Sequence, residues 1–130
     1  MDFIALSDDG SLPQDSKIKE WHRLICEGAS YANINMRMSS AALKTKFENA
    51  GFTNVEVVNK KIPMGRWPED QKLKEIGMWQ LEAFLSGLEA FSLAIFCRCL
   101  GRSCGEVQIL LAQVRDDVKR NETFHWYWPL

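Results

Sequence analysis

The longest apolar pattern in the chain, residues 73–100, constrains the fold more than any other feature. Its side chains recur at steps of three and four, which is the stripe that an α-helix buries. That stripe consists of Leu81, Phe84, Leu85, Leu88, Ser92, Ile95, Phe96 and Cys99. A second line has the same spacing but only small side chains, so we expect this helix to be packed on two sides. The line consists of Ala83, Gly87, Ala90 and Ala94.

Two further expectations concern the length and the setting of this helix. Unbroken, it would span about 40 Å, longer than a domain of this size is wide, so we expect a bend near residues 86–87. Charged residues interrupt the apolar pattern, which argues against a membrane span. They are Lys74, Glu75, Glu82, Glu89 and Arg98.

The composition limits the size and the partners of the protein. Its 130 residues, 46% of them hydrophobic, predict a single domain over residues 1–130 with its own core. The 16 basic and 17 acidic residues are well mixed and give a net charge of −1, which argues against a nucleic-acid-binding surface. The N-terminal residues lack the pattern of a signal peptide, so we expect a cytoplasmic protein.

The four cysteines do not form a metal-binding motif. No CxxC pair is present, and the two histidines lie far from the cysteines in the sequence. We therefore expect no metal site, and we expect reduced, mostly buried thiols. The cysteines are Cys26, Cys97, Cys99 and Cys104.

Start and stop signals predict the remaining elements. Helices are expected from residue 15 or 16 to 29, from 39 or 40 to 50, from 68 to 100, and from a Ser-x-x-Glu capping box at 103 to 121. Strands are expected over residues 52–63 and 124–130, with a short one near 3–6. The fold class is therefore α+β, mainly helical, with a short antiparallel β ribbon. Such a ribbon leaves an open edge, so we expect a homodimer, formed by strand pairing or by exchange of the terminal segment.

Four short motifs point to a known family. They are Ala50-Gly51-Phe52, Pro63-x-Gly65-x-Trp67-Pro68, Leu88-Glu89-x-Phe91-Ser92, and Val114-Arg115 before His125. From about residue 7 to 129 the chain resembles the C-terminal half of fungal class I S-adenosylmethionine-dependent methyltransferases, the LaeA-like group associated with secondary metabolism. The resemblance implies a truncated class I methyltransferase-like fold, in which this chain supplies the last strands of the sheet and the helical substrate lid.

The part of that family that binds the cofactor has no counterpart in this sequence. The family holds the cofactor with a glycine-rich loop after the first strand and an acidic residue after the second. No GxGxG occurs here, because the eight glycines are scattered. We therefore expect that this chain alone binds no cofactor in the family's way, and no cofactor residue is carried over.

Aromatic residues dominate the candidate site. A pocket between the long helix and the terminal strand would suit a small hydrophobic metabolite; the alternative is that these side chains form the core. The substrate-binding candidates are Trp67, Trp79, Phe84, Phe91, Trp126, Tyr127, Trp128 and Arg66. His125 and Glu82 are the candidate acid–base catalysts, because histidine titrates near neutrality and an apolar setting raises the pKa of a carboxylate. The alternatives for these two are a hydrogen-bonded strand residue and a solvated carboxylate.

Three functions fit these observations. In the favoured one, the chain is an enzyme that has lost methyl transfer and promotes a cofactor-free cyclisation or pericyclic reaction, such as a cycloaddition, of a hydrophobic intermediate. In the second, it is the substrate-binding half of a methyltransferase and acts with a partner chain that binds the cofactor. In the third, it is a non-catalytic interaction protein or an inert gene fragment.

Overall fold

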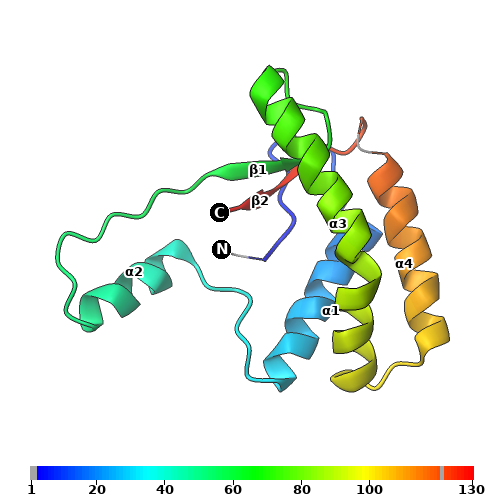
Figure 1. The fold of residues 1–130 in the computed structure, drawn as a ribbon, viewed down its shortest axis with the longest axis horizontal. Coiled ribbons are helices and arrows are strands. Elements are labelled where there is room, and N and C mark those ends of the chain that lie inside the picture. The colour runs from blue at the N-terminus through cyan, green and yellow to red at the C-terminus, as the bar shows by residue number, and fades with distance from the viewer. Residues whose placement is uncertain (1–2, 121) are drawn as a thin grey trace.

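The computed structural model describes residues 3–120 and 122–130. Its elements are, in chain order, α1 (Lys17–Tyr31), α2 (Ser40–Asn49), β1 (Lys61–Met64), α3 (Gln71–Arg98), α4 (Cys104–Lys119) and β2 (Trp126–Pro129). Helices α1, α3 and α4 pack against one another, and α3 also packs on β1 (Figure 1). The expected fold class, α+β and mainly helical, is confirmed.

β1 and β2 form the antiparallel ribbon that the sequence predicted. Lys61 lies opposite Pro129 at one end of the ribbon, and Met64 lies opposite Trp126 at the other end. On its other edge β2 meets the N-terminal segment, because Leu6 and Tyr127 exchange backbone hydrogen bonds of 3.1 and 2.9 Å. β2 therefore lies between β1 and the N-terminal segment, and one edge of the ribbon is partly covered.

Both strands are shorter than predicted. Of the predicted strand 52–63, only the part from Lys61 onward pairs with β2. Just before it, the backbones of Lys60 and Leu130 exchange two hydrogen bonds of 2.9 and 2.8 Å. Residues 52–59 find no partner strand in the described part of the chain, because β2 pairs through only four residues. The predicted strand at residues 3–6 is reduced to the single bridge at Leu6.

The long helix α3 is one continuous helix from Gln71 to Arg98. It is therefore not divided into two helices at residues 86–87, where the sequence analysis expected a bend. Its buried residues are Gly77, Phe84, Leu88, Ser92 and Phe96. The last four belong to the predicted stripe, which is confirmed. The prediction of packing on two sides is wrong for this chain, because the line of small residues is exposed while α1, α4 and β1 cover the other stripe.

Capping residues explain where three of the helices begin. The hydroxyls of Ser16 and Ser39 each accept a hydrogen bond from a backbone N–H in the first turn of α1 and α2, respectively. At α4 the predicted capping box is complete, since Ser103 accepts from the N–H of Glu106 and Glu106 accepts from the N–H of Ser103.

The predicted start of α3 at Pro68 is wrong. The helix begins at Gln71, because the Asp70 carboxylate accepts a hydrogen bond of 2.8 Å from the N–H of Leu73 and so caps the helix two residues later. At the other end of the chain, the predicted stop of α4 at Asn121 lies outside the described residues.

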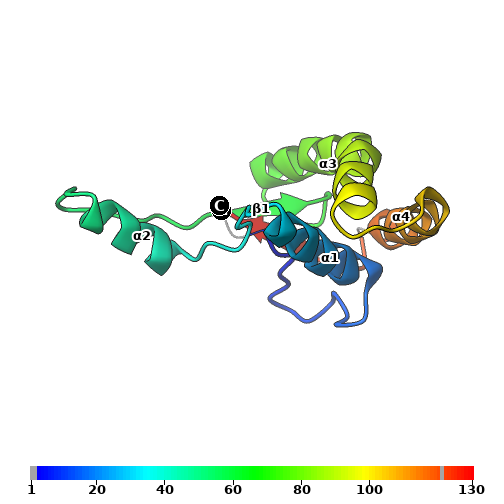
Figure 2. The same cartoon turned by 90° about the horizontal axis from the view of Figure 1, so that it is seen from below.

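α2 departs most from expectation. Gly51 follows it with φ of +96°, a backbone conformation that favours glycine after the end of a helix, but no residue of α2 is buried. The apolar side chains of Leu43, Phe47 and Ala50 therefore form no core with the body of the protein. α2 contacts no other helix or strand of the described chain. Figures 1 and 2 show residues 38–59, here called the α2 arm, extending from one side of the body.

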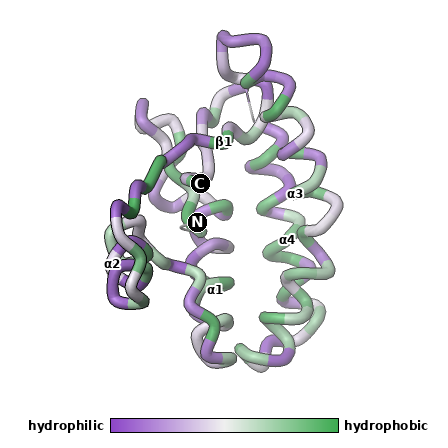
Figure 3. The backbone as a smooth tube through the Cα atoms, turned by 60° about the vertical axis from the view of Figure 1, so that its left-hand side comes forward, coloured by the Kyte–Doolittle hydropathy of each residue, from purple (hydrophilic) through white to green (hydrophobic). Residues whose placement is uncertain are grey.

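The core lies between α1, α3, α4 and the ribbon. Trp21 of α1, Phe96 of α3, Leu111 of α4 and Trp126 of β2 are at most 2% exposed. Hydrophobic and hydrophilic positions alternate along these helices, as one-sided packing requires (Figure 3).

α3 also meets the length and composition test for a helix that could cross a membrane, with a mean hydropathy of 1.3 over an 18-residue window. The core helix of a soluble protein meets the same test. Here Glu89 of α3 accepts hydrogen bonds of 2.8 Å from Gln108 and 3.3 Å from Arg115 of α4. These contacts favour packing against α4 over contact with lipid, and the lack of a membrane span stays a prediction.

Candidate ligand-binding groove

An aromatic cluster joins the N-terminal segment, α1, α3 and β2. Its rings are Phe3, Trp21, His22, Phe84, Phe91, Trp126 and Trp128. The ring of Phe84 lies edge-on to Trp21 at 5.2 Å and to Trp128 at 5.8 Å between centroids. Edge-to-face contacts of this kind stabilise aromatic clusters beyond the burial of their area. The cluster therefore fixes the positions of the N-terminal segment, α1, α3 and β2 relative to one another, although these segments are far apart in the sequence.

The polar side-chain atoms of Trp21, His22 and Trp128 in this cluster form hydrogen bonds within the core. Trp21 Nε1 donates to the Ser92 hydroxyl at 2.7 Å, and Trp128 Nε1 donates to His22 Nε2 at 2.7 Å. Because Nε2 accepts, the ring proton of His22 is on Nδ1, which donates to the Ile18 carbonyl at 2.8 Å. Burial lowers the pKa of His22 to about 4, so the imidazole is neutral at pH 7.

A groove opens over this cluster, with a volume of about 260 Å³. Its lining consists of Phe3, Trp21, Ala83, Phe84, Gly87, Leu88, Phe91 and Trp128. None of these side chains is titratable. The Phe91 side chain, which also lines the groove, is 40% exposed. The groove is open beside Gly87, because no atom lies within 4 Å of the position that a Cβ would take on this residue. The groove is thus an apolar surface lined mainly by aromatic side chains.

Three of the predicted substrate-binding residues meet in this groove: Phe84, Phe91 and Trp128. Trp126 belongs to the same cluster but is fully buried, and its Nε1 has no hydrogen-bond partner among the described residues. The remaining predicted residues lie elsewhere. Trp79 is 63% exposed on α3.

Arg66 also lies outside the groove. Its side chain is exposed, and its guanidinium contacts the sulfur of Met78 at 2.8 Å. Trp67 stacks on His125, with ring centroids 5.3 Å apart and planes 21° from parallel, while its Nε1 donates to the backbone carbonyl of Trp126 at 3.1 Å. These contacts place Trp67 and Arg66 near the turn between β1 and α3.

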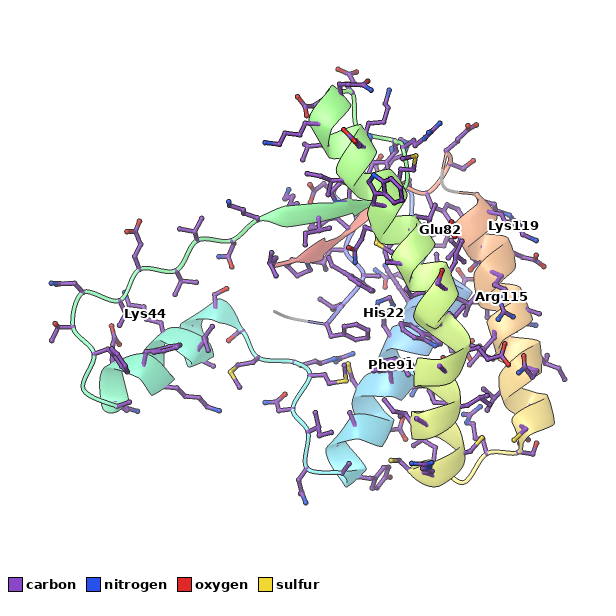
Figure 4. The ribbon with its side chains drawn as sticks, viewed as in Figure 1. His22, Lys44, Glu82, Phe91, Arg115 and Lys119 are labelled. Carbon is purple, nitrogen blue, oxygen red and sulfur yellow. The ribbon has the colours of Figure 1, made fainter. Side chains whose placement is uncertain are left out.

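The two acid–base candidates lie apart from the groove. His125 Nδ1 lies 2.6 Å from an Asp9 carboxylate oxygen, and the backbone N–H of His125 donates to the Ser11 hydroxyl at 2.7 Å. Glu82 is exposed on α3, toward its N-terminal end from Phe91 (Figure 4). Neither side chain lines the groove.

A second polar cluster holds the N-terminal segment to the ribbon. Tyr127 donates its hydroxyl hydrogen to Asp8 at 2.7 Å, and Lys61 forms an ion pair with the same carboxylate. The Lys61 hydrogen bond, followed by that from Tyr127, lowers the pKa of Asp8. Hydrogen bonds from the side chain and then the backbone of Ser11 lower the pKa of Asp9. This cluster therefore orients Tyr127 away from the groove.

Sequence reasoning missed Phe3, Trp21 and His22 as groove or cluster residues. Periodicity could identify their burial, but it carries no signal for which rings of other elements they contact. Among the described residues, no group of three or more His, Cys, Asp or Glu side chains could hold a metal ion.

The thiols are less buried than expected. Cys26, Cys97 and Cys99 are half-buried, and Cys104 is exposed. Cys104 is exposed because it stands in the first turn of α4, where the helix emerges from the connection to α3.

Comparisons with known proteins find that most of this chain is similar to part of several fungal methyltransferases. It is 33% identical over 124 residues to the probable methyltransferase tdiE of Emericella nidulans, a match covering 95% of this chain and 38% of that protein. It is 37% identical over 123 residues to the methyltransferase pytC of Aspergillus terreus, covering 92% and 36%. The protein-methionine methyltransferase laeA of Chaetomium globosum is 26% identical over 121 residues, covering 93% and 38%.

The chain thus spans little more than a third of the length of these relatives. No family model matches it, and no solved structure matches it. The predicted resemblance to the C-terminal part of fungal, LaeA-like methyltransferases is confirmed.

Proposed function

Because this chain is homologous to the C-terminal part of fungal methyltransferases, we propose that it binds a flat hydrophobic intermediate of secondary metabolism in the aromatic groove. The observation that carries the proposal is the groove itself, in which Phe84, Phe91 and Trp128 form an apolar surface. Aromatic walls bind flat molecules through dispersion and the removal of apolar surface from water.

We further propose that the bound molecule undergoes a cofactor-free cyclisation or pericyclic step. Such a reaction requires that the substrate be held in a folded conformation, and an apolar surface can do this without proton transfer. The lining supports this chemistry, because none of its side chains is titratable. His125 and Glu82 would act as acid or base only on a substrate that extends beyond the groove.

A binding experiment tests the groove directly. Isothermal titration calorimetry with 1,4-naphthoquinone, a flat apolar probe, should show saturable binding to the wild type. Phe91→Ala should weaken binding about fivefold, which corresponds to about 1 kcal/mol of lost contact. Trp79→Ala is the matched control, because Trp79 is an exposed aromatic of the same helix outside the groove. Equal affinities for both variants would exclude the groove as the binding site.

The reaction is tested with intermediates of the biosynthetic pathway and mass spectrometry. A rearranged product of unchanged mass is expected for cyclisation, whereas the gain of one methyl group would indicate methyl transfer. Calorimetry with S-adenosylmethionine should show no binding to the chain alone. Micromolar binding of that cofactor would overturn the proposal of a cofactor-free reaction.

The α2 arm favours a second function, in which this chain acts with a partner chain that binds the cofactor. Phe47 and Phe52 pack edge-to-face at 5.5 Å on the arm, and both stay exposed together with Val58. An apolar hollow of about 420 Å³ lies between α2 and residues 52–58. Exposed apolar surface of this kind is typical of protein interfaces.

Copurification from the source organism distinguishes these alternatives. Recovery of a chain that contains a GxGxG loop would support the second function. A homodimer, which we also propose, would appear as a doubled mass in sedimentation equilibrium of the pure protein. Phe52→Asp on the arm should shift either complex toward the free chain.

A further inference from the structure

Two cysteines face each other where α3 passes into α4. Cys97 lies in the last turn of α3, Cys104 is the first residue of α4, and their Sγ atoms are 3.7 Å apart. The connection between the helices is tight, because Gly101 adopts φ of +63° and the N–H of Arg102 donates back to the carbonyl of Phe96 at 3.0 Å. The two thiols are therefore held close by the backbone of the helix corner.

The two thiols differ in their surroundings. Cys97 is half-buried and packs against the hydrophobic core, whereas Cys104 is exposed to solvent. Burial, and then the hydrogen bond with Cys104, raises the pKa of Cys97. Cys104 is therefore the thiol that a soluble reagent reaches first, and Cys97 is positioned behind it.

We propose that Cys97 and Cys104 form a reversible disulfide that links α3 to α4 under oxidising conditions. The oxidant is a small-molecule disulfide such as oxidised glutathione. The Cys104 thiolate attacks one sulfur of that disulfide, which forms a mixed disulfide and releases one glutathione thiolate. Cys97 then loses its proton and attacks the Cys104 sulfur, which releases the second glutathione. Two protein thiols are oxidised, and one glutathione disulfide is reduced to two thiols.

The geometry admits this bond with little movement. A disulfide needs an S–S distance of about 2.05 Å, so the two sulfur atoms must approach by about 1.7 Å, which side-chain rotation can supply. The other cysteines are placed differently. Cys99 follows Cys97 by two residues and so points to nearly the opposite side of the helix end. Cys26 lies on α1 and donates its thiol hydrogen to the carbonyl of Phe3 at 3.4 Å.

The test is oxidation of the full-length chain in glutathione redox buffers, followed by alkylation of the remaining thiols and intact-mass and peptide analysis. The wild type should lose about 2 Da and keep two alkylatable thiols of its four, with one peptide pair linked through residues 97 and 104. Reduction with dithiothreitol should restore all four thiols. Cys99→Ser, the matched control from the same turn between the helices, should also lose about 2 Da and keep one alkylatable thiol of its three.

Cys104→Ser should keep its three thiols under the same conditions. Because Cys104 is exposed, this variant should fold normally, so its result stands even if Cys97→Ser is unstable. The proposal is overturned if the wild type keeps four free thiols, if it stops at a glutathione adduct on Cys104, or if the linked pair is Cys99 with Cys104. A disulfide found only between chains would overturn it as well.

Discussion

Gly77 on α3 offers a sharp test of how the ribbon is fixed to the long helix. A Cβ placed on Gly77 would lie 2.0 Å from the carbonyl oxygen of Gly65 and 3.1 Å from its carbonyl carbon. Gly65 stands in the turn after β1 at φ of +99°, and its N–H donates to the Gly77 carbonyl at 3.0 Å. The contact is between backbones, so no side chain can rotate away from an added methyl group.

The magnitude of Gly77→Ala follows from two opposing terms. Alanine gains about 1 kcal/mol over glycine in a helix interior. Separating the backbones until the new contact is near 3.4 Å is overpacking, which costs about 1–3 kcal/mol, and stretching the hydrogen bond costs about 1 kcal/mol more. We therefore expect a net loss of about 2 kcal/mol in the free energy of unfolding.

Gly87→Ala in the same helix is the matched control. No atom lies within 4 Å of its added Cβ, so only the helix propensity changes and the variant should gain about 1 kcal/mol. Urea unfolding followed by circular dichroism should separate the two midpoints by at least about 1 M. A Gly77→Ala midpoint at or above that of the wild type would show that the turn moves freely, and the proposed role of this contact would be wrong.

Three further substitutions test individual contacts. In urea unfolding, the wild type should lose about 2 kcal/mol of unfolding free energy when the pH falls from about 7.5 to about 5, and His22→Gln should not show this loss. The unfolded histidine gains a proton below about pH 6.5, whereas folded His22, with a pKa of about 4, stays neutral. The unfolded state therefore binds more protons, and acid favours it. Ser92→Ala should lower the free energy of unfolding, measured by thermal unfolding, by about 1–3 kcal/mol, because Trp21 Nε1 loses its buried acceptor. Ser86→Ala is the control from the exposed face of the same helix, and it should change the free energy of unfolding by less than about 0.5 kcal/mol. Ser103→Ala removes the capping box of α4 and should cost about 1 kcal/mol of unfolding free energy in urea, and an unchanged midpoint would show that the cap is dispensable.

Local sequence signals predicted the helices well. The stripe around Phe84 and Leu88 and the capping box at Ser103 each depend on residues within one or two turns, so the pattern contains the information that is needed. The helix start at Asp70 shows the limit of such signals. Pro68 and Asp70 both suit a helix start, and only the chain's path through the preceding turn decided between them.

Contacts between distant segments depend on the tertiary structure. The sequence placed Phe84, Phe91 and Trp128 among many aromatic candidates, but only the folded chain brings these three into one groove. His125 and Glu82 were chosen for their chemical type, which carries no information about distance, and both lie outside that groove.

The sequence by itself determined the helical class, the α3 stripe, the strand character of the two ribbon segments and the similarity to fungal methyltransferases, because each of these depends on local pattern or on residue identity. The tertiary structure alone decided the neutral state of His22, the exposure of the α2 arm and the closeness of Cys97 to Cys104. Burial and the distance between side chains arise from packing between segments, and no spacing along the chain specifies them.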